Sequence, residues 1–340
     1  MVWRNRIYFA SIVCFGVLLL QPGILSRTCA QDISISKEVD KGSRRSIMVV
    51  VGASGEEEFG KAFRESAERW HTAFQSEDFL LLDGSDPEKK ETNNHLQQIL
   101  DWLSRPSVDE RLQERWLVLI GHGTNDRTAA KFNLKGPDVS ADAISKAISK
   151  VNAKWLIIDC SSSSGPFINA LSGPNRVVIT GTKSGSEQNY ARFGEFLSKS
   201  IADPSTDLDH DDGVSILEAF LAASNRVVQF YENEGRLASE QALLDDNGDS
   251  RGTPAAFYRG ARPVKAPANG LKLDGAFASR ILVTSFGVPD KRSIEQRTLA
   301  DSLAEQIELV RARKKEMADD DYYQELERLF LEIAKTNNAQ

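Results

Sequence analysis

The chain has 340 residues, 41% of them hydrophobic, and a formal net charge of -7 at pH 7. This length and apolar content are enough for one large domain or two smaller ones with a sizeable core. The acidic balance argues against nucleic acid as a partner, because neutralising phosphates requires a basic face and the sequence has none.

The first 30 residues have the pattern of a secretory signal peptide. Arg4 and Arg6 precede an apolar stretch at 7–20, and Thr28-Cys29-Ala30 forms a small-residue cleavage site. The apolar stretch is shorter than the roughly 20 residues of a membrane-spanning helix, so membrane attachment is expected only if the signal is uncleaved. We expect an exported protein, periplasmic or secreted, with a polar spacer at 31–44.

The chain contains three cysteines, at positions 14, 29 and 160. Cleavage after Ala30 would leave Cys160 as the only one in the mature protein. Cysteines usually pair in an oxidising compartment, so an unpaired one indicates either an intermolecular bond or a reactive thiol.

Strand-like and helix-like segments alternate along residues 45–287, which we expect to form one domain. The expected strands are 46–51, 79–82, a run ending at His122, a run ending at Cys160, 176–180 and 281–284. The expected helices are 56–74, 96–103, 141–151, 190–201 and 215–231. Near-continuous apolar strands alternating with helices predict an α/β fold, a three-layer α/β/α sandwich with a mainly parallel sheet.

His122 and Cys160 each follow an apolar run of strand length. In an open parallel sheet, such positions line the crevice beyond the carboxyl ends of the strands, where ligands bind. A cysteine nucleophile needs a nearby base, and His122 is the only histidine so placed, because His71 and His95 fall in predicted helices and His210 in an acidic loop. The pattern predicts a Cys-His catalytic dyad.

The residues beside the dyad fit this hypothesis. Gly121 and Gly123 let the backbone turn tightly around His122, and the amides of Gly123 and Cys160 are candidate oxyanion donors. The run Ser161–Ser164 is expected to expose a helix start, whose amide dipoles would favour a thiolate. The alternative is a buried structural cysteine and a histidine that satisfies a turn; the matching positions on neighbouring strands favour catalysis.

Gly121-His122-Gly123 and the segment Asp159–Gly165 resemble the caspase-like cysteine peptidases, the group of legumains, caspases and gingipains, which carry a His-Gly and a Cys at the ends of these two strands. Residues 178–190 are similar to a legumain-type segment. The resemblance covers roughly residues 45–235. It implies a caspase-like sheet and an endopeptidase that cleaves peptides or proteins through a thioester on Cys160, with His122 as general base and acid and no cofactor for the chemistry.

The resemblance also implies that residues 178–190 help to shape a substrate pocket. The candidate pocket residues are Asp159, Ser184 and Glu187. Legumains usually have Glu-Ala before the cysteine, whereas this chain has Ile158-Asp159, so an Asn-selecting pocket does not carry over, and the two acidic residues point to a cationic side chain. A second hypothesis is a catalytically inactive caspase-like binding or scaffold protein that acts through its C-terminal helices.

Two other interpretations of the sequence, a phosphate-binding loop and an α/β-hydrolase, do not fit its residues. Residues 55–62 nearly spell a phosphate-binding loop, but Ala62 lacks the hydroxyl that would bind Mg²⁺ and three glutamates would occupy the phosphate cradle. An α/β-hydrolase would need a histidine late in the chain, and the last one is His210.

An acidic loop has the ligand spacing of a calcium site. Asp207, Asp209, Asp211, Ser215 and Glu218 fall at positions 1, 3, 5, 9 and 12 of such a loop, but the turn glycine stands at position 7 instead of 6. A calcium ion here would be structural. The equally weighted alternative is a solvated acidic loop that caps the following helix.

Residues 288–340 change to charged, helix-forming sequence. Two apolar stripes at helical spacing predict a helical hairpin that packs against the main domain or self-associates. The stripes are Leu299, Leu303, Ile307 and Val310, and Tyr322, Leu326, Leu329 and Ile333.

Overall fold

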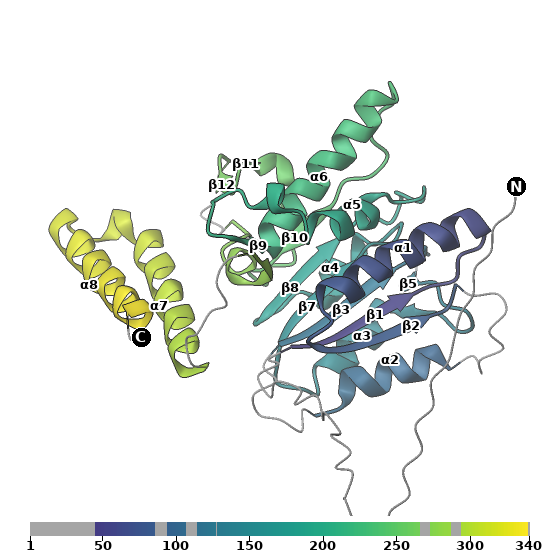
Figure 1. Cartoon of the computed structure of the whole chain (residues 1–340), viewed down its shortest axis with the longest axis horizontal. Coiled ribbons are helices and arrows are strands. Elements are labelled where there is room, and N and C mark those ends of the chain that lie inside the picture. Colours follow the sequence, from purple (N-terminus) through teal and green to yellow (C-terminus); the bar gives the residue numbers. More distant parts are fainter. Residues whose placement is uncertain are drawn as a thin grey trace, which may run out of the picture. The chain divides into compact units, whose positions relative to one another are not determined.

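The computed structural model describes residues 45–85, 94–106, 114–126, 128–265, 273–286 and 294–338 (Figure 1). The predicted signal peptide and polar spacer lie outside the described residues. Among the helices that the structure describes, none has the length and apolar character needed to cross a bilayer.

The central sheet has six strands in the order β2-β1-β3-β7-β8-β10. They are β1 (Arg45–Val51), β2 (Asp78–Asp83), β3 (Glu114–Ile120), β7 (Lys154–Asp159), β8 (Arg176–Thr180) and β10 (Leu243–Asp245). The first five are parallel, and β10 joins β8 in the antiparallel sense. In the register, Leu119 of β3 lies opposite Asp159 of β7, which lies opposite Thr180 of β8, so these strands end together at one edge.

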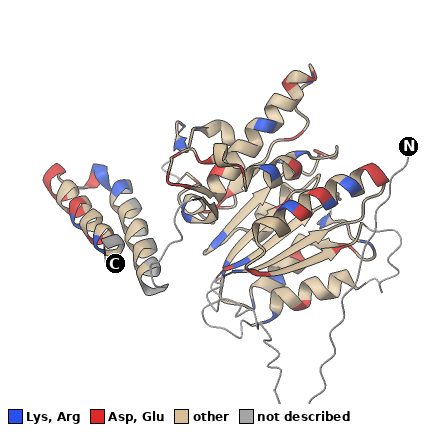
Figure 2. Cartoon of the chain, in the orientation of Figure 1, with Lys and Arg blue, Asp and Glu red and all other residues tan. Residues whose placement is uncertain are grey.

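Helices cover both faces of this sheet (Figure 1). On one face, alternate strand residues pack with α1 (Glu57–Ala73), α5 (Phe193–Ser200) and α6 (Ile216–Asn233). On the other face, the intervening residues pack with α2 (His95–Ser104), α3 (Ala141–Ile148) and α4 (Pro166–Leu171). Charged residues lie mainly in the helices and loops around the sheet (Figure 2). The predicted three-layer α/β/α sandwich with a mainly parallel sheet is therefore confirmed.

Several short elements were not predicted from the sequence. They are the antiparallel strands β4 (Gly123–Asn125), β5 (Ala130–Phe132) and β6 (Val139–Ser140), the pair β11 (Tyr258–Arg259) and β12 (Arg262–Pro263), and β9 (Gly213–Ser215), which pairs with β13 (Leu282–Ser285). Single turns of 3₁₀ helix span Pro204–Thr206, Ala255–Phe257, Ala278–Arg280 and Lys314–Glu316. Strands of two to four residues are too short to show a hydrophobic period.

The C-terminal residues form the predicted helical hairpin. Helices α7 (Ile294–Ala312) and α8 (Asp319–Asn338) pack through Leu303, Ile307 and Leu329, which are buried. Partly buried residues of both predicted stripes complete this small core, namely Val310, Leu326 and Ile333.

Candidate active site

The strand order reverses beside β1, because β2 lies on one side of it and β3 on the other. In open α/β sheets, such a reversal opens a crevice at the carboxyl ends of the strands. His122 lies two residues beyond β3, and Cys160 directly follows the neighbouring strand β7. The structure thus brings both predicted catalytic residues to the same edge of the sheet.

The two side chains also lie on the same face. Cys160 packs, like Ile158 of β7, in the apolar layer beneath α1, α5 and α6. The His122 ring makes edge contacts with Phe59 and Phe63 of α1, with ring centroids 5.1 and 5.2 Å apart. Phe63 belongs to the same apolar layer as Cys160, so the imidazole and the thiol are both on the α1 side of the sheet.

The imidazole of His122 is half-buried and is oriented by the segment after β1. Its Nε2 atom lies 3.2 Å from the carbonyl oxygen of Ser54. A carbonyl only accepts hydrogen bonds, so Nε2 carries the proton in the neutral ring and Nδ1 is the nitrogen left to act as a base. Burial lowers the pKa of His122, against the opposing effects of the Ser54 bond and the Glu56 charge. The environment therefore favours the neutral imidazole.

The thiol of Cys160 is closed off from solvent, with 3% of the residue exposed. Burial raises the pKa of Cys160, and the charges of Asp159 and Glu240 raise it further. This differs from the expected thiolate, because the described surroundings of the sulfur offer desolvation and negative charge. These surroundings favour a neutral thiol at Cys160, as burial favours a neutral imidazole at His122.

The glycines that flank His122 permit close packing of the backbone. Neither has a positive φ angle. A Cβ atom on Gly121 would lie 3.0 Å from the ring of Phe132, and one on Gly123 would lie 2.4 Å from the carbonyl oxygen of Ser162. Gly123 therefore allows the strand after His122 to approach the turn after Cys160.

The predicted pair of oxyanion donors is not formed in this conformation. The Cys160 amide donates to the carbonyl of Leu119 at 2.9 Å, which continues the ladder between β3 and β7. The prediction for the Cys160 amide is therefore wrong. The Gly123 amide donates to the Ser162 hydroxyl at 3.2 Å. It becomes a donor to substrate only if that hydroxyl rotates away.

The serine run after Cys160 is a buried turn, and the prediction of an exposed helix start is wrong. All four of its serines are buried, and Ser163 has a φ angle of 56°. Helix α4 begins later, at Pro166, and has only six residues. The hydroxyls of Ser164 and Thr182 lie 3.1 Å apart, which ties the turn to the segment after β8.

Asp159 does not take part in a pocket. It is fully buried, and its Oδ1 atom accepts a hydrogen bond from the Ser161 amide at 2.9 Å. Burial raises the pKa of Asp159 to about 6, although the hydrogen bonds from Ser161 lower it. No substrate side chain reaches a carboxyl group in this position, so we remove Asp159 from the candidate pocket.

Ser184 and Glu187 do lie beside the turn that follows Cys160. The missing side chain of Gly165 lets the chain pass closely, since a Cβ atom there would lie 2.4 Å from the Ser184 amide nitrogen. The carbonyl of Glu187 accepts a hydrogen bond from the Ser163 amide at 2.8 Å. The Glu187 carboxylate accepts from the amides of Lys183 and Gln241 at 3.0 and 3.2 Å through the same oxygen, Oε2.

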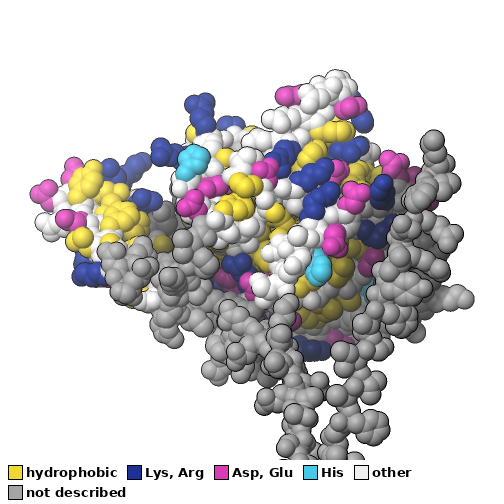
Figure 3. Space-filling model, in the orientation of Figure 1, with side chains coloured by type: hydrophobic (Ala, Val, Ile, Leu, Met, Phe, Trp, Pro, Cys, Tyr) yellow, Lys and Arg dark blue, Asp and Glu magenta, His cyan; other side chains and the backbone are white. Residues whose placement is uncertain are grey.

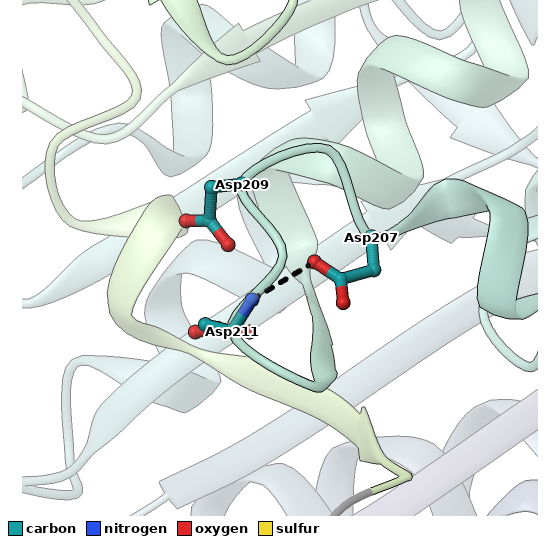
Figure 4. A group of neighbouring side chains, drawn as sticks. All are labelled: Asp207, Asp209 and Asp211. Atoms are coloured by element: carbon teal, nitrogen blue, oxygen red, sulfur yellow. Dashed lines mark hydrogen bonds between the residues drawn. The ribbon is translucent and has the colours of Figure 1, made fainter.

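The predicted calcium ligands come together only in part. Asp207, Asp209 and Asp211 place carboxylate oxygens within 4.8 Å of one another (Figure 4). Ser215 and Glu218 instead form a capping box at the start of α6, in which the Glu218 carboxylate accepts from the Ser215 amide and the Ser215 hydroxyl accepts from the Glu218 amide. The helix-capping alternative is confirmed for these two residues, and three carboxylates remain as candidate ligands.

The sequence did not indicate Ser54 or Glu240 as residues of this region, and it indicated Tyr190 only as the last residue of the expected pocket segment 178–190. Ser54 follows β1 at the crevice, so its position was a usable signal. The Tyr190 ring lies with its centroid 6.3 Å from that of His122 and 4.9 Å from that of Phe59. Glu240 lies far along the chain from both dyad residues, and nothing in the local sequence pointed to it.

No protein-family model and no curated protein matches this chain. Among solved structures, it is similar to the Drosophila initiator caspase Dronc, with 11% identity, a TM-score of 0.39 and coverage of 62% of this chain and 82% of that one. Raptor from Chaetomium thermophilum matches with 9% identity and a TM-score of 0.28 over 86% of this chain, which corresponds to 25% of Raptor. Because both TM-scores are below 0.5, we draw no conclusion about activity from either similarity.

Proposed function

We propose that this protein is an exported, caspase-like cysteine endopeptidase. One observation carries the proposal: Cys160 and His122 follow adjacent parallel strands and lie on one face of the sheet, beside the point where the strand order reverses. A thiol and a base placed in this way can form the nucleophilic pair of an acyl-transfer site. The signal-like pattern of residues 1–30 supports export.

The neutral dyad defines how the reaction would start. As the Cys160 sulfur attacks the substrate carbonyl, the thiol proton passes to Nδ1 of His122, and the carbonyl oxygen becomes an oxyanion. Collapse of this intermediate breaks the C–N bond, and the imidazolium returns its proton to the leaving amine. Water, deprotonated by His122, then hydrolyses the thioester and regenerates the thiol. The Ser54 carbonyl holds the imidazole orientation through these steps.

The Gly123 amide is the oxyanion donor that this site offers once the Ser162 hydroxyl turns aside. The loop that contains Ser184 and Glu187 lines the substrate pocket of the proposed site. The Glu187 carboxylate favours a cationic side chain before the scissile bond, by charge complementarity. The proposed chemistry uses no cofactor.

A second candidate is an inactive scaffold protein that binds partners through its C-terminal helices. It is favoured by the same burial that raises the pKa of Cys160. Together with the hydrogen bond that occupies the Gly123 amide, this burial is what an inactive relative would also display.

Hydrolysis of a peptide library with varied side chains before the scissile bond distinguishes the two candidates. We expect the full-length mature protein to cleave a subset of the library, and Cys160→Ala and His122→Ala each to lower kcat/KM by at least about 10³-fold, the scale of loss when a nucleophile or its base is removed. An acyloxymethyl ketone should label Cys160 stoichiometrically in the wild type and far more slowly in His122→Ala.

The matched control is His71→Ala, which removes a partly exposed histidine on α1 away from the dyad. Its cleavage rate should equal that of the wild type. If the wild type cleaves no peptide while Cys160→Ala binds partners as the wild type does, the peptidase proposal is wrong and the scaffold candidate stands.

A further inference from the structure

One short segment lies across both residues of the dyad. Residues 190–194, which we call the cover segment, run from the loop after β8 into the first turn of α5. At one end, the Tyr190 ring stacks on Phe59 and lies next to His122, with centroid separations of 4.9 and 6.3 Å. The cover segment therefore completes the aromatic surroundings of the imidazole.

At its other end, the cover segment packs directly against the Cys160 side chain. A Cβ atom on Gly194 would lie 2.6 Å from Cβ and 3.1 Å from Sγ of Cys160. Only a glycine permits this approach, and the result is the 3% exposure of Cys160. The backbone of the first turn of α5 is thus what separates the thiol from solvent on this side.

Glu240, which is distant in sequence, holds the cover segment in place through hydrogen bonds. Its two carboxylate oxygens accept from the amides of Arg192 and Phe193, each at 3.0 Å. The Tyr231 hydroxyl donates to Oε1 of the same carboxylate at 3.1 Å. Glu240 is 6% exposed, so these charge-assisted bonds are shielded from water. The Arg192 guanidinium also lies 4.1 Å from the ring centroid of Phe230 on α6.

We propose that the cover segment is a latch that keeps the dyad closed, that Glu240 holds it shut, and that a peptide gains access to Cys160 only after the segment moves away. This inference rests on the proposed function, because it assigns regulation to the same site. The described conformation is the closed, latent form. The open form is a minor state that a bound substrate or partner would favour.

The rate at which iodoacetamide alkylates Cys160, followed by peptide mass mapping of the full mature chain, tests the latch without requiring peptidase activity. In Glu240→Gln, an NH₂ group replaces one of the two carboxylate oxygens that accept from the amides of Arg192 and Phe193. An NH₂ group cannot accept a hydrogen bond from an amide, so one of the two bonds is lost. We expect alkylation to accelerate at least about tenfold, in line with a tenfold shift toward the open state. Tyr190→Ala should accelerate alkylation independently, and Tyr190→Phe should not, because the ring and not the hydroxyl covers His122.

Two controls separate opening of the latch from unfolding. Glu234→Gln changes an exposed glutamate just beyond α6 and should alkylate at the wild-type rate. Urea unfolding of every variant gives its stability; acceleration in Glu240→Gln and Tyr190→Ala beyond what their loss of stability explains supports the latch. Unchanged rates, or rates that follow stability alone, overturn it.

The outcomes for the latch and the peptidase are distinguishable. If the variants are alkylated faster but neither they nor the wild type cleave any peptide, the latch proposal is supported and the peptidase proposal is wrong. If the wild type cleaves peptides and its Cys160 is alkylated as fast as a free thiol, the peptidase proposal is supported and the latch proposal is wrong.

Discussion

Asp159 ends β7 one residue before Cys160, and its carboxyl group is fully buried. Burial raises its pKa from 3.8 to about 6, so the folded protein retains a proton that the unfolded chain has already released. The free energy of unfolding therefore falls as the pH rises through this window, by up to about 3 kcal/mol from this group. Above the folded pKa, the protein carries a buried charge whose Oδ2 atom has no hydrogen-bond partner among the described residues.

We expect Asp159→Asn to remove this dependence. Asn accepts the Ser161 amide bond but does not ionise, so the variant should match the wild type near pH 4 and exceed it by about 1–3 kcal/mol at pH 7. Urea denaturation at both pH values measures the difference. Glu327→Gln, at an exposed position of α8, is the control and should show no such change. A variant that is less stable than the wild type at both pH values would contradict the prediction.

At the residue scale, the sequence could predict that His122 and Cys160 follow neighbouring strands, but it could not predict what surrounds them. Neighbouring parallel strands that each end in a functional residue must deliver those residues to one edge, and this argument placed His122 and Cys160 correctly. The closure of the thiol depends on Gly194 and on Glu240, which are distant in sequence. Likewise, the Cys160 amide stays in the strand ladder because the pairing of β7 with Leu119 of β3 continues one residue past the end of β7.

The loop at 207–212, between the 3₁₀ turn Pro204–Thr206 and β9, brings carboxylates close enough to repel one another. Asp209 and Asp211 have pKa values raised first by burial and then by neighbouring carboxylates, Glu218 for Asp209 and Asp209 for Asp211. Asp207 is used differently, because its carboxylate accepts hydrogen bonds from the amides of His210, Asp211 and Asp212. The Asp207 carboxylate thus stabilises the loop by accepting backbone hydrogen bonds, while the carboxylates of Asp209 and Asp211 repel each other. A bound cation would relieve that repulsion.

We expect calcium to stabilise the wild type, by about 2.7 kcal/mol at a concentration 100 times the dissociation constant. Asp209→Asn should raise the thermal midpoint in EDTA, because it removes a repelled charge, and should abolish most of the gain from calcium. Thermal unfolding with EDTA and with calcium measures both effects. Asp142→Asn, an exposed position on α3, is the control. If calcium does not change the wild-type midpoint, the loop serves only to cap α6.

At the element scale, long segments were predictable and short ones were not. The apolar run 176–180 is strand β8, and the periodic stretch 56–74 contains α1, because a full hydrophobic period fits within each. Helix α5 begins at Phe193, later than the predicted 190, since Glu240 accepts the amides of Arg192 and Phe193 at its start. The strands β4 to β6 depend on pairing with one another, which no local pattern encodes.

The molecule as a whole combines a domain whose sheet is covered on both faces with a hairpin that leaves apolar side chains exposed. Leu299, Leu309, Tyr323, Phe330 and Leu331 of the hairpin are each about half exposed, at 47–57%. Figure 3 shows apolar side chains at the surface of this part of the chain. Such a density of exposed apolar groups in a short segment is typical of an interaction surface.

We expect this surface to mediate self-association of the full chain. Tyr323 and Phe330 are seven residues apart on α8 and therefore share one face, so the double variant Tyr323→Glu and Phe330→Glu places two charges in any contact made there. Sedimentation velocity between about 1 and 100 µM should show a concentration-dependent dimer for the wild type and a monomer for the variant. Leu237→Glu, at an apolar position outside the hairpin that is 94% exposed, should dimerise like the wild type. A wild type that stays monomeric throughout, paired with a double variant of lowered thermal stability, would instead assign the exposed face to contacts within one chain.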